Sequence, residues 1–212
     1  MDMVDSYAAN EVKLSSFEES DIPDSAGVYC YRFNPFDPTA LEIYSDRRLG
    51  DVKLKRAKRA LSVRLNALWE ITETSAVDLD FQLRNFAGRL LGESRLNSTL
   101  KSNLKRETFN DFGADEFQEF LRFSNLCSSF LPPLYIGIAV EQTLRKRHSQ
   151  HKRDFINRKT GTFGGRLANF KLDWYDLSYV CMPAAGFTGL AKTADAAEQT
   201  LFAITKPLLG NR

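Results

Sequence analysis

Two tyrosines far apart in the chain each lie in a short apolar run that also holds a glycine. Tyr29 belongs to the run AGVYCY and Tyr135 to the run PLYIGIA. A basic segment, LRKRHSQH at 144–151, and an isolated carboxylate, Glu198, follow. Phenols hydrogen-bond phosphate oxygens or water, an arginine fork binds two phosphate oxygens, and one carboxylate can help to hold Mg²⁺. If the fold brings them together, side chains of these types indicate chemistry on a phosphate ester.

The two runs resemble the Gly-Ile-Tyr and Tyr-Ile-Gly signature of the GIY-YIG endonuclease superfamily, here as Gly27-Val28-Tyr29 and Tyr135-Ile136-Gly137. In that superfamily two adjacent strands aim their tyrosines at one scissile phosphate. The downstream chain continues the resemblance with a Leu-x-x-Arg-x-x-x-His spacing over 144–151 and a further strand-like run at 177–182. The helix-like segment 195–211 then carries one glutamate followed by Lys-Pro-Leu and an asparagine, a pattern similar to the GIY-YIG restriction endonucleases.

The resemblance implies a role for each candidate residue. Tyr29 contacts the attacking water, Tyr135 hydrogen-bonds a phosphate oxygen, and Glu198 binds a magnesium or manganese ion. A phenol has an ordinary pKa near ~10, and Ile138 stands where many relatives carry lysine. This weakens tyrosine as the base and leaves metal-bound hydroxide as a competing nucleophile. Asn211 braces the site.

The arginine that clamps the phosphate has two candidates. Arg147 fits the register with His151, which would protonate the leaving group or hold a phosphate. Arg166, in FGGRL, fits the place where the restriction relatives carry theirs, but Phe170 stands where the partner histidine would be. We favour Arg147, and both remain candidates.

The sequence patterns around these residues predict an α/β fold. Apolar runs bounded by Pro, Ser and Asp predict three strands at 27–33, 134–139 and 177–182 in a small sheet flanked by helices. Leucines at helical spacing, among them Leu79, Leu83 and Leu96, predict an all-helical insertion of about four helices over 40–131.

This interpretation divides the chain into three parts. Residues 1–24 form a polar lead-in, 25–33 together with 133–212 form the GIY-YIG core, and 34–132 form the insertion, which serves target recognition or dimerisation. Closing so long a loop is tolerable because the entropy cost grows only with the logarithm of loop length.

The charge distribution favours nucleic acid as partner, although the net charge of the 212 residues is only +2. Basic side chains gather in two stretches, and such clusters neutralise phosphates. The first, 53–59, is equally well explained as a solvated helix face. The candidates for DNA contact are Lys53, Lys55, Arg56, Lys58, Arg59, Arg145, Lys146, Lys152 and Arg153.

The number of cysteines and the hydropathy of the chain indicate its cellular location. Cys30, Cys127 and Cys181 are an odd, widely spaced set, which argues against a disulfide framework or a zinc site. Because no apolar run reaches bilayer length and no leader-like segment opens the chain, we expect no membrane contact and a cytoplasmic location.

The sequence thus predicts a Mg²⁺-dependent DNA endonuclease, acting on double-stranded DNA in restriction or phage defence, with a homodimer as one option. Two rivals remain open. One is a structure-specific repair or recombination nuclease. The other is a non-catalytic nucleic-acid-binding module on a GIY-YIG scaffold.

Overall fold

A four-stranded antiparallel sheet is the centre of the fold. The computed structural model describes residues 10–14, 18–43, 49–74, 78–84, 90–97, 109–170, 172–184, 196, 198–201 and 207–209. The strands are β1 (Asn10–Lys13), β2 (Gly27–Phe33), β5 (Tyr135–Ala139) and β6 (Leu177–Pro183), in the order β1-β6-β2-β5. The three predicted strands are therefore confirmed and adjacent, and β1, from the segment predicted as a lead-in, adds an edge strand beside β6.

The two faces of the sheet follow from the alternation of β2. Gly27, Tyr29, Tyr31 and Phe33 are buried, and the residues between them are half-buried. Successive side chains of a strand point to opposite faces, so the tyrosines share one face. The register pairs Tyr29 with Gly137 and Tyr31 with Tyr135, which places Tyr135 on that face too.

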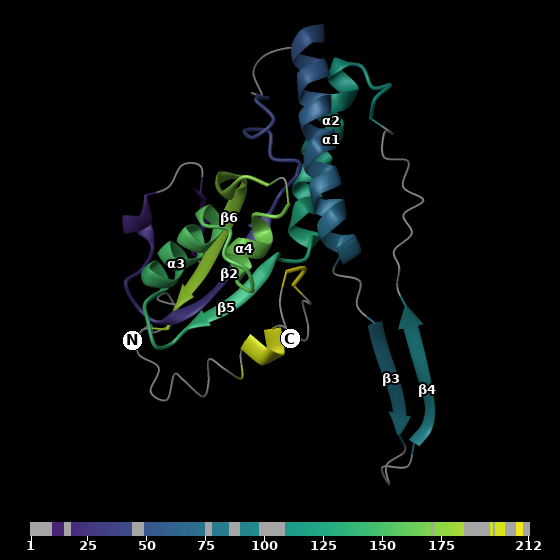
Figure 1. Cartoon of the computed structure of the whole chain (residues 1–212). Helices are drawn as coiled ribbons and strands as arrows, with labels where there is room; N and C mark the ends of the chain where they lie inside the picture. The colour runs from purple at the N-terminus through teal and green to yellow at the C-terminus, as the bar shows by residue number, and fades with distance from the viewer. Residues whose placement is uncertain are drawn as a thin grey trace, which may run out of the picture.

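Helix α3 (Leu144–Ile156) covers the tyrosine face, and α4 (Phe163–Leu167) packs on α3 (Figure 1). The α3 helix begins at Thr143, whose hydroxyl accepts from the Lys146 amide at 3.3 Å. Its buried face holds Leu144, His148 and His151. Gly164 permits the close contact of α4 with α3, because a Cβ there would lie 2.3 Å from the His151 carbonyl oxygen.

The insertion is not all-helical, which corrects the prediction from the sequence. It comprises α1 (Asp51–Thr74), a hairpin of β3 (Asp78–Arg84) and β4 (Leu90–Asn97), and α2 (Ala114–Cys127). Leu79 and Leu83 fit a helical spacing, but Phe81 between them gives DLDFQLR the period of a strand. Figure 1 shows the hairpin extending away from the sheet, beyond the ends of α1 and α2.

A second hydrophobic cluster gives the insertion its own core. It is built around Leu61, Phe117 and Leu121, where α1 and α2 lie side by side (Figure 1). Ala67 and Ile71, farther along α1, instead join the main core beneath the sheet. Helix α1 therefore packs into both cores.

No helix among the described residues is long and apolar enough to cross a bilayer.

Three short 3₁₀ helices complete the described elements. They are η3 (Glu19–Asp21), η4 (Ser128–Phe130) and η5 (Trp174–Asp176). The first precedes β2, the second follows α2, and the third leads into β6.

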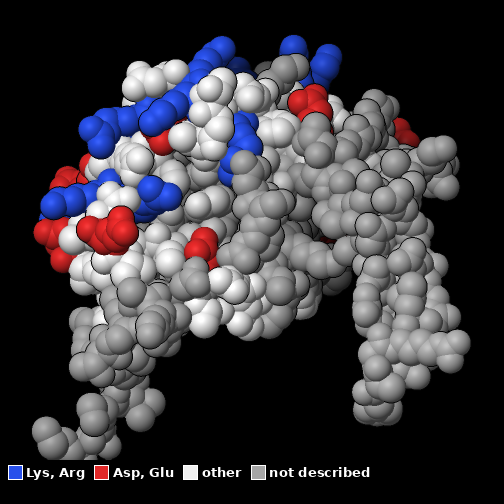
Figure 2. Space-filling model, turned by 60° about the horizontal axis from the view of Figure 1, so that its bottom comes forward, with Lys and Arg blue, Asp and Glu red and all other residues white. Residues whose placement is uncertain are grey.

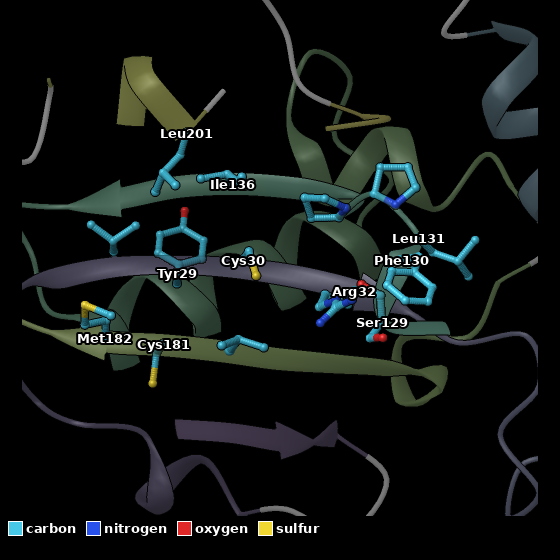
Figure 3. A pocket seen from close by; sticks show the side chains of 14 residues that line it. Tyr29, Cys30, Arg32, Ser129, Phe130, Leu131, Ile136, Cys181, Met182 and Leu201 are labelled. Atoms are coloured by element: carbon cyan, nitrogen blue, oxygen red, sulfur yellow. Dashed lines mark hydrogen bonds between the residues drawn. The ribbon is translucent and has the colours of Figure 1, made fainter. Parts of the chain in front are cut away.

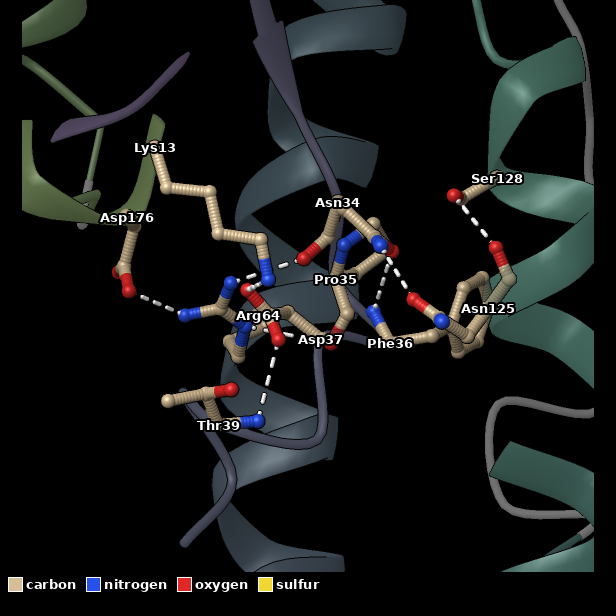
Figure 4. Close-up of polar contacts among 10 residues, drawn as sticks. All are labelled: Lys13, Asn34, Pro35, Phe36, Asp37, Thr39, Arg64, Asn125, Ser128 and Asp176. Atoms are coloured by element: carbon tan, nitrogen blue, oxygen red, sulfur yellow. Dashed lines mark hydrogen bonds and ion pairs between the residues drawn. The ribbon is translucent and has the colours of Figure 1, made fainter. Parts of the chain in front are cut away.

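A buried arginine joins the insertion to the sheet (Figure 4). Arg64 of α1 is 7% exposed and lies 2.5 Å from the Asp176 carboxylate. It also donates to the Pro35 carbonyl at 3.2 Å and the Asn34 carbonyl at 2.9 Å. The amide of Asn34 in turn donates to Asn125 of α2 at 2.6 Å. Both helices of the insertion are thus tied to the end of β2.

We predict that Arg64→Met lowers the free energy of unfolding by about 3 kcal/mol, because it leaves Asp176 and two carbonyl groups without their donor. Chemical denaturation monitored by circular dichroism measures this loss. The matched control is Lys13→Ala, which breaks the more exposed pair with Asp37 and should cost about 1 kcal/mol or less. Equal losses for the two variants would contradict a structural role for the buried pair.

Candidate active site

Tyr29, Arg147 and His151 meet at one phenol oxygen. The Tyr29 hydroxyl lies 2.8 Å from His151 Nε2 and accepts a hydrogen bond from Arg147 Nε at 3.2 Å. Arg147 and His151 lie four residues apart on α3, so both reach the same strand. Tyr135 is adjacent: its ring centroid lies 6.1 Å from that of Tyr29 and 5.5 Å from that of His151.

Donor chemistry fixes the direction of one bond in this cluster. Arginine only donates, so Arg147 occupies one lone pair of the Tyr29 oxygen. In the bond between Tyr29 and His151 the donor is set by the histidine tautomer. His151 Nδ1 is buried without a hydrogen-bond partner among the described residues. The Tyr29 hydroxyl also interacts with Tyr135, so its oxygen lies within a connected polar network.

Burial keeps both partners of this bond neutral. Desolvation, together with the nearby Tyr135, raises the pKa of Tyr29 well above its ordinary value, against the opposing effect of Arg147. Desolvation and the charge of Arg147 lower the pKa of His151 to about 3. At neutral pH the phenol keeps its proton and the imidazole carries no charge. A buried neutral histidine does not suit the general-acid role that the sequence suggested for His151.

A second phenol–imidazole bond lies directly beside the first. The Tyr31 hydroxyl and His148 Nδ1 are 2.9 Å apart, with Tyr31 fully buried. Desolvation raises the pKa of Tyr31 and lowers that of His148 to about 4. Our sequence interpretation missed this pair. A tyrosine two residues after Tyr29 and a histidine three residues before His151 were the signal that would have revealed it.

Gly137 makes room for the Tyr29 side chain. A Cβ at this position would lie 2.6 Å from the Tyr29 hydroxyl and 2.8 Å from the Tyr135 ring. Real Cβ atoms do not approach so closely, so any larger residue would displace the phenol oxygen. The glycine of the second motif is therefore explained by the position of the first tyrosine.

Arg166 lies on the same side of the sheet but contacts the C-terminal segment. It donates to the Leu209 carbonyl at 2.6 Å, and the Leu209 amide donates to the Leu134 carbonyl at 2.7 Å, just before β5. Its charge also acts on Tyr135 and His151. Of the two arginine candidates, Arg147 is the one that contacts Tyr29, and Arg166 holds the end of the chain against β5.

Glu198 belongs to a segment that borders a groove on the sheet. It is half-buried in the short helical segment 198–201. Leu201 of that segment lines a groove of about 520 Å³, which Tyr29, Cys30 and Ile136 also line (Figure 3). The contacts described above join Tyr29, Tyr135, Arg147 and His151. Asn211 lies outside the described residues.

The basic residues predicted to contact DNA divide into two kinds. In three of them the charged group bonds to another part of the protein. Arg145 donates to the Ser20 and Ile22 carbonyls, Lys152 pairs with Glu19 at 3.2 Å, and Lys58 donates to the Asn110 and Phe112 carbonyls. The others are exposed, namely Lys53, Lys55, Arg56, Arg59, Lys146 and Arg153, and of these Arg56 lies 3.6 Å from the Glu42 carboxylate.

Exposed basic side chains remain available at two places. Lys55 and Arg59, with Lys58, line a groove of about 420 Å³ along α1. On the face shown in Figure 2, Lys and Arg side chains spread over the upper left, with acidic side chains beside them at the left edge. On this face and along α1, the described basic side chains thus form local surfaces, and on the face shown acidic side chains lie beside them.

The cluster around Tyr29 suits an anion better than a cation. Its donors are two phenols, a guanidinium and an imidazole, and a second guanidinium acts on it electrostatically. Mg²⁺ prefers carboxylate oxygens. Within the described ranges, no group of three or more His, Cys, Asp and Glu side chains is placed to hold a metal ion. The four-residue cluster alone does not fit a magnesium site.

Comparison with known proteins gives no match to a family model, a curated protein or a solved structure.

The two buried histidines predict a loss of stability in acid. Because their pKa values are lowered in the folded protein, the unfolded chain binds protons first as the pH falls below about 6.5. Each histidine should then destabilise the fold by about 2 kcal/mol between pH 6.5 and 5, with no contribution above pH 7. Denaturation at a series of pH values measures this slope. His148→Gln removes one titrating group and should flatten it; an unchanged slope would contradict the assignment.

The space around Gly137 makes a second prediction. Gly137→Ala should destabilise the fold by about 2 kcal/mol and break the bond between Tyr29 and His151, because the new methyl group overlaps the phenol. Gly50→Ala is the matched control, since a Cβ at Gly50 meets no atom within 4 Å and should change stability by less than about 0.5 kcal/mol. A Gly137→Ala variant as stable as the control would show that the phenol does not occupy this position.

Proposed function

We propose that the chain is a GIY-YIG-type endonuclease that hydrolyses DNA phosphodiester bonds. The observation that carries the proposal is the convergence of Tyr29, Tyr135, Arg147 and His151 from two adjacent strands and the helix after the second. The four residues are among the seven that the resemblance picks out, and each is of a type that binds a phosphate or the water that attacks it.

In this proposal Tyr29 orients the nucleophile. Arg147 and His151 hold the phenol oxygen of Tyr29 in place, and this oxygen contacts the attacking water. The raised pKa of Tyr29 means that it acts as a neutral phenol and not as a preformed phenolate. Water adds to phosphorus, the bond to the leaving oxygen breaks, and the proton from water ends on that oxygen.

Arg147 supplies the charge that the phosphate needs. Burial acts to lower the pKa of Arg147, but the phenols of Tyr29 and Tyr135 outweigh it and raise the value, so the guanidinium stays charged. A planar, half-buried cation beside two phenols suits a phosphoryl group whose negative charge grows in the transition state. Magnesium, with Glu198 as its proposed ligand, would neutralise further charge, and no step above depends on it.

A role in restriction or phage defence is the preferred form of this proposal. It rests on the similarity of the C-terminal pattern to restriction endonucleases. The exposed basic groove along α1 supports a DNA-contacting insertion. A non-catalytic nucleic-acid-binding module is the second candidate, because the cluster suits an anion and no group of three or more metal-ligating side chains is found among the described residues.

Cleavage of supercoiled plasmid DNA with and without Mg²⁺ tests the proposal. Arg147→Ala and Tyr29→Phe should each slow cleavage by about 100-fold or more, because each removes a group that acts in the transition state. Glu198→Ala should abolish Mg²⁺-dependent cleavage. The control is Arg122→Ala, an exposed arginine on α2.

The outcomes separate the two candidates. If the parent protein binds DNA but no divalent ion supports cleavage, the binding module is favoured and the endonuclease proposal fails. If Glu198→Ala cuts as fast as the parent, Glu198 is not the metal ligand.

A further inference from the structure

Two glutamines form a hydrogen-bonded chain that ends at Arg147. Arg147 Nη1 donates to Gln150 Oε1 at 3.0 Å, and Gln142 Nε2 donates to the same oxygen at 3.2 Å. Through its Nε, Arg147 also donates to Tyr29. The polar chain therefore runs from the loop before α3, through Gln150, to the arginine and the phenol.

Donor chemistry fixes the orientation of both amides. Arginine has no acceptor, so Gln150 must present its carbonyl oxygen to Arg147. That oxygen already faces the guanidinium, and the group of Gln142 that approaches it must be the NH₂. Gln142 holds the Gln150 oxygen in place, and that oxygen holds Arg147.

The guanidinium is thereby held at two of its corners. Nε is held by the Tyr29 oxygen and Nη1 by the Gln150 oxygen. An arginine has five N–H groups in one plane, so two bonds at different nitrogens fix both the position and the tilt of that plane. Tyr135 also interacts with the guanidinium, and the N–H groups left over can bind a phosphate. The three side chains of this hydrogen-bonded network, Gln142, Arg147 and Gln150, are half-buried. Substrate can therefore reach the guanidinium.

We propose that Gln150, supported by Gln142, is the positioning residue that aims the Arg147 fork at the scissile phosphate. The inference rests on the proposed function, in which Arg147 binds that phosphate. Gln150 acts through Arg147 and takes no part in bond making. Preorganised donors cost no reorientation when charge develops, so losing the glutamine oxygen should reduce turnover more than binding.

The test compares three variants of the full chain in plasmid cleavage with Mg²⁺. Gln150→Ala removes the acceptor and should lower kcat by about 10- to 100-fold with KM within about threefold of the parent. Gln150→Glu keeps an acceptor oxygen at the same place and should recover most of the loss. Gln142→Ala should have a smaller effect than Gln150→Ala. Ile156→Ala, an exposed position at the end of α3, is the control.

A second readout is independent of cleavage. The side-chain Nε–H signal of Arg147, assigned in ¹⁵N NMR by its absence from Arg147→Lys, reports how firmly the guanidinium is held. Its hydrogen should exchange with water about 10-fold faster in Gln150→Ala than in the parent, and near the parental rate in Gln150→Glu. Unchanged exchange in Gln150→Ala would overturn the positioning role.

The two readouts keep the inference separate from the proposed function. A parent protein that does not cleave DNA would contradict the endonuclease proposal, while the exchange rates would still decide whether Gln150 holds Arg147. If Gln150→Ala changed kcat no more than Ile156→Ala in an active enzyme, the positioning role would be wrong even though the nuclease proposal stood.

Discussion

The pair of hydrogen bonds between phenols and imidazoles, Tyr29 with His151 and Tyr31 with His148, is the interaction on which the rest of the structure depends. All four side chains are at most 3% exposed, so they lie where water cannot satisfy their polar atoms. A buried hydroxyl or ring nitrogen without a partner costs more than the bond itself contributes. The core can therefore close only when helix α3 lies on strand β2 in one register.

This register also explains why α3 presents Arg147 where it does. Tyr29 and Tyr31 are about 6.6 Å apart along the strand, and His148 and His151 are about 4.5 Å apart along the helix axis. Because the earlier tyrosine meets the later histidine, the helix runs opposite to β2. Arg147 then lies within reach of Tyr29 on the rim of the buried pair. The site is thus a consequence of core packing as much as of its own contacts.

Sequence patterns predicted the parts of the fold in which one periodicity dominates. The strands with Tyr29 and Tyr135 are short apolar runs with clear boundaries, and the structure places them side by side. The insertion was harder, since leucines four apart fit a helix while the alternation around Phe81 fits a strand, and β3 has the second period. Strand β1 was missed because its pairing with β6 is long-range and its four residues, NEVK, hold a single apolar side chain and give no alternation.

The candidate site was predictable only to the extent that helix and strand geometry already joined its members. Arg147 and His151 share a helical face by their spacing, and a single sheet register brings them to Tyr29. Glu198 depends on how the chain after β6 returns to the sheet. There the backbone bonds of Leu208 and Leu209 to Pro133 and Leu134 hold the end of the chain along β5. No periodicity encodes such an edge contact, so the carboxylate's place relative to the phenols is set by tertiary structure alone. The cluster of phenols, imidazole and guanidinium is the part of the site that the core itself enforces.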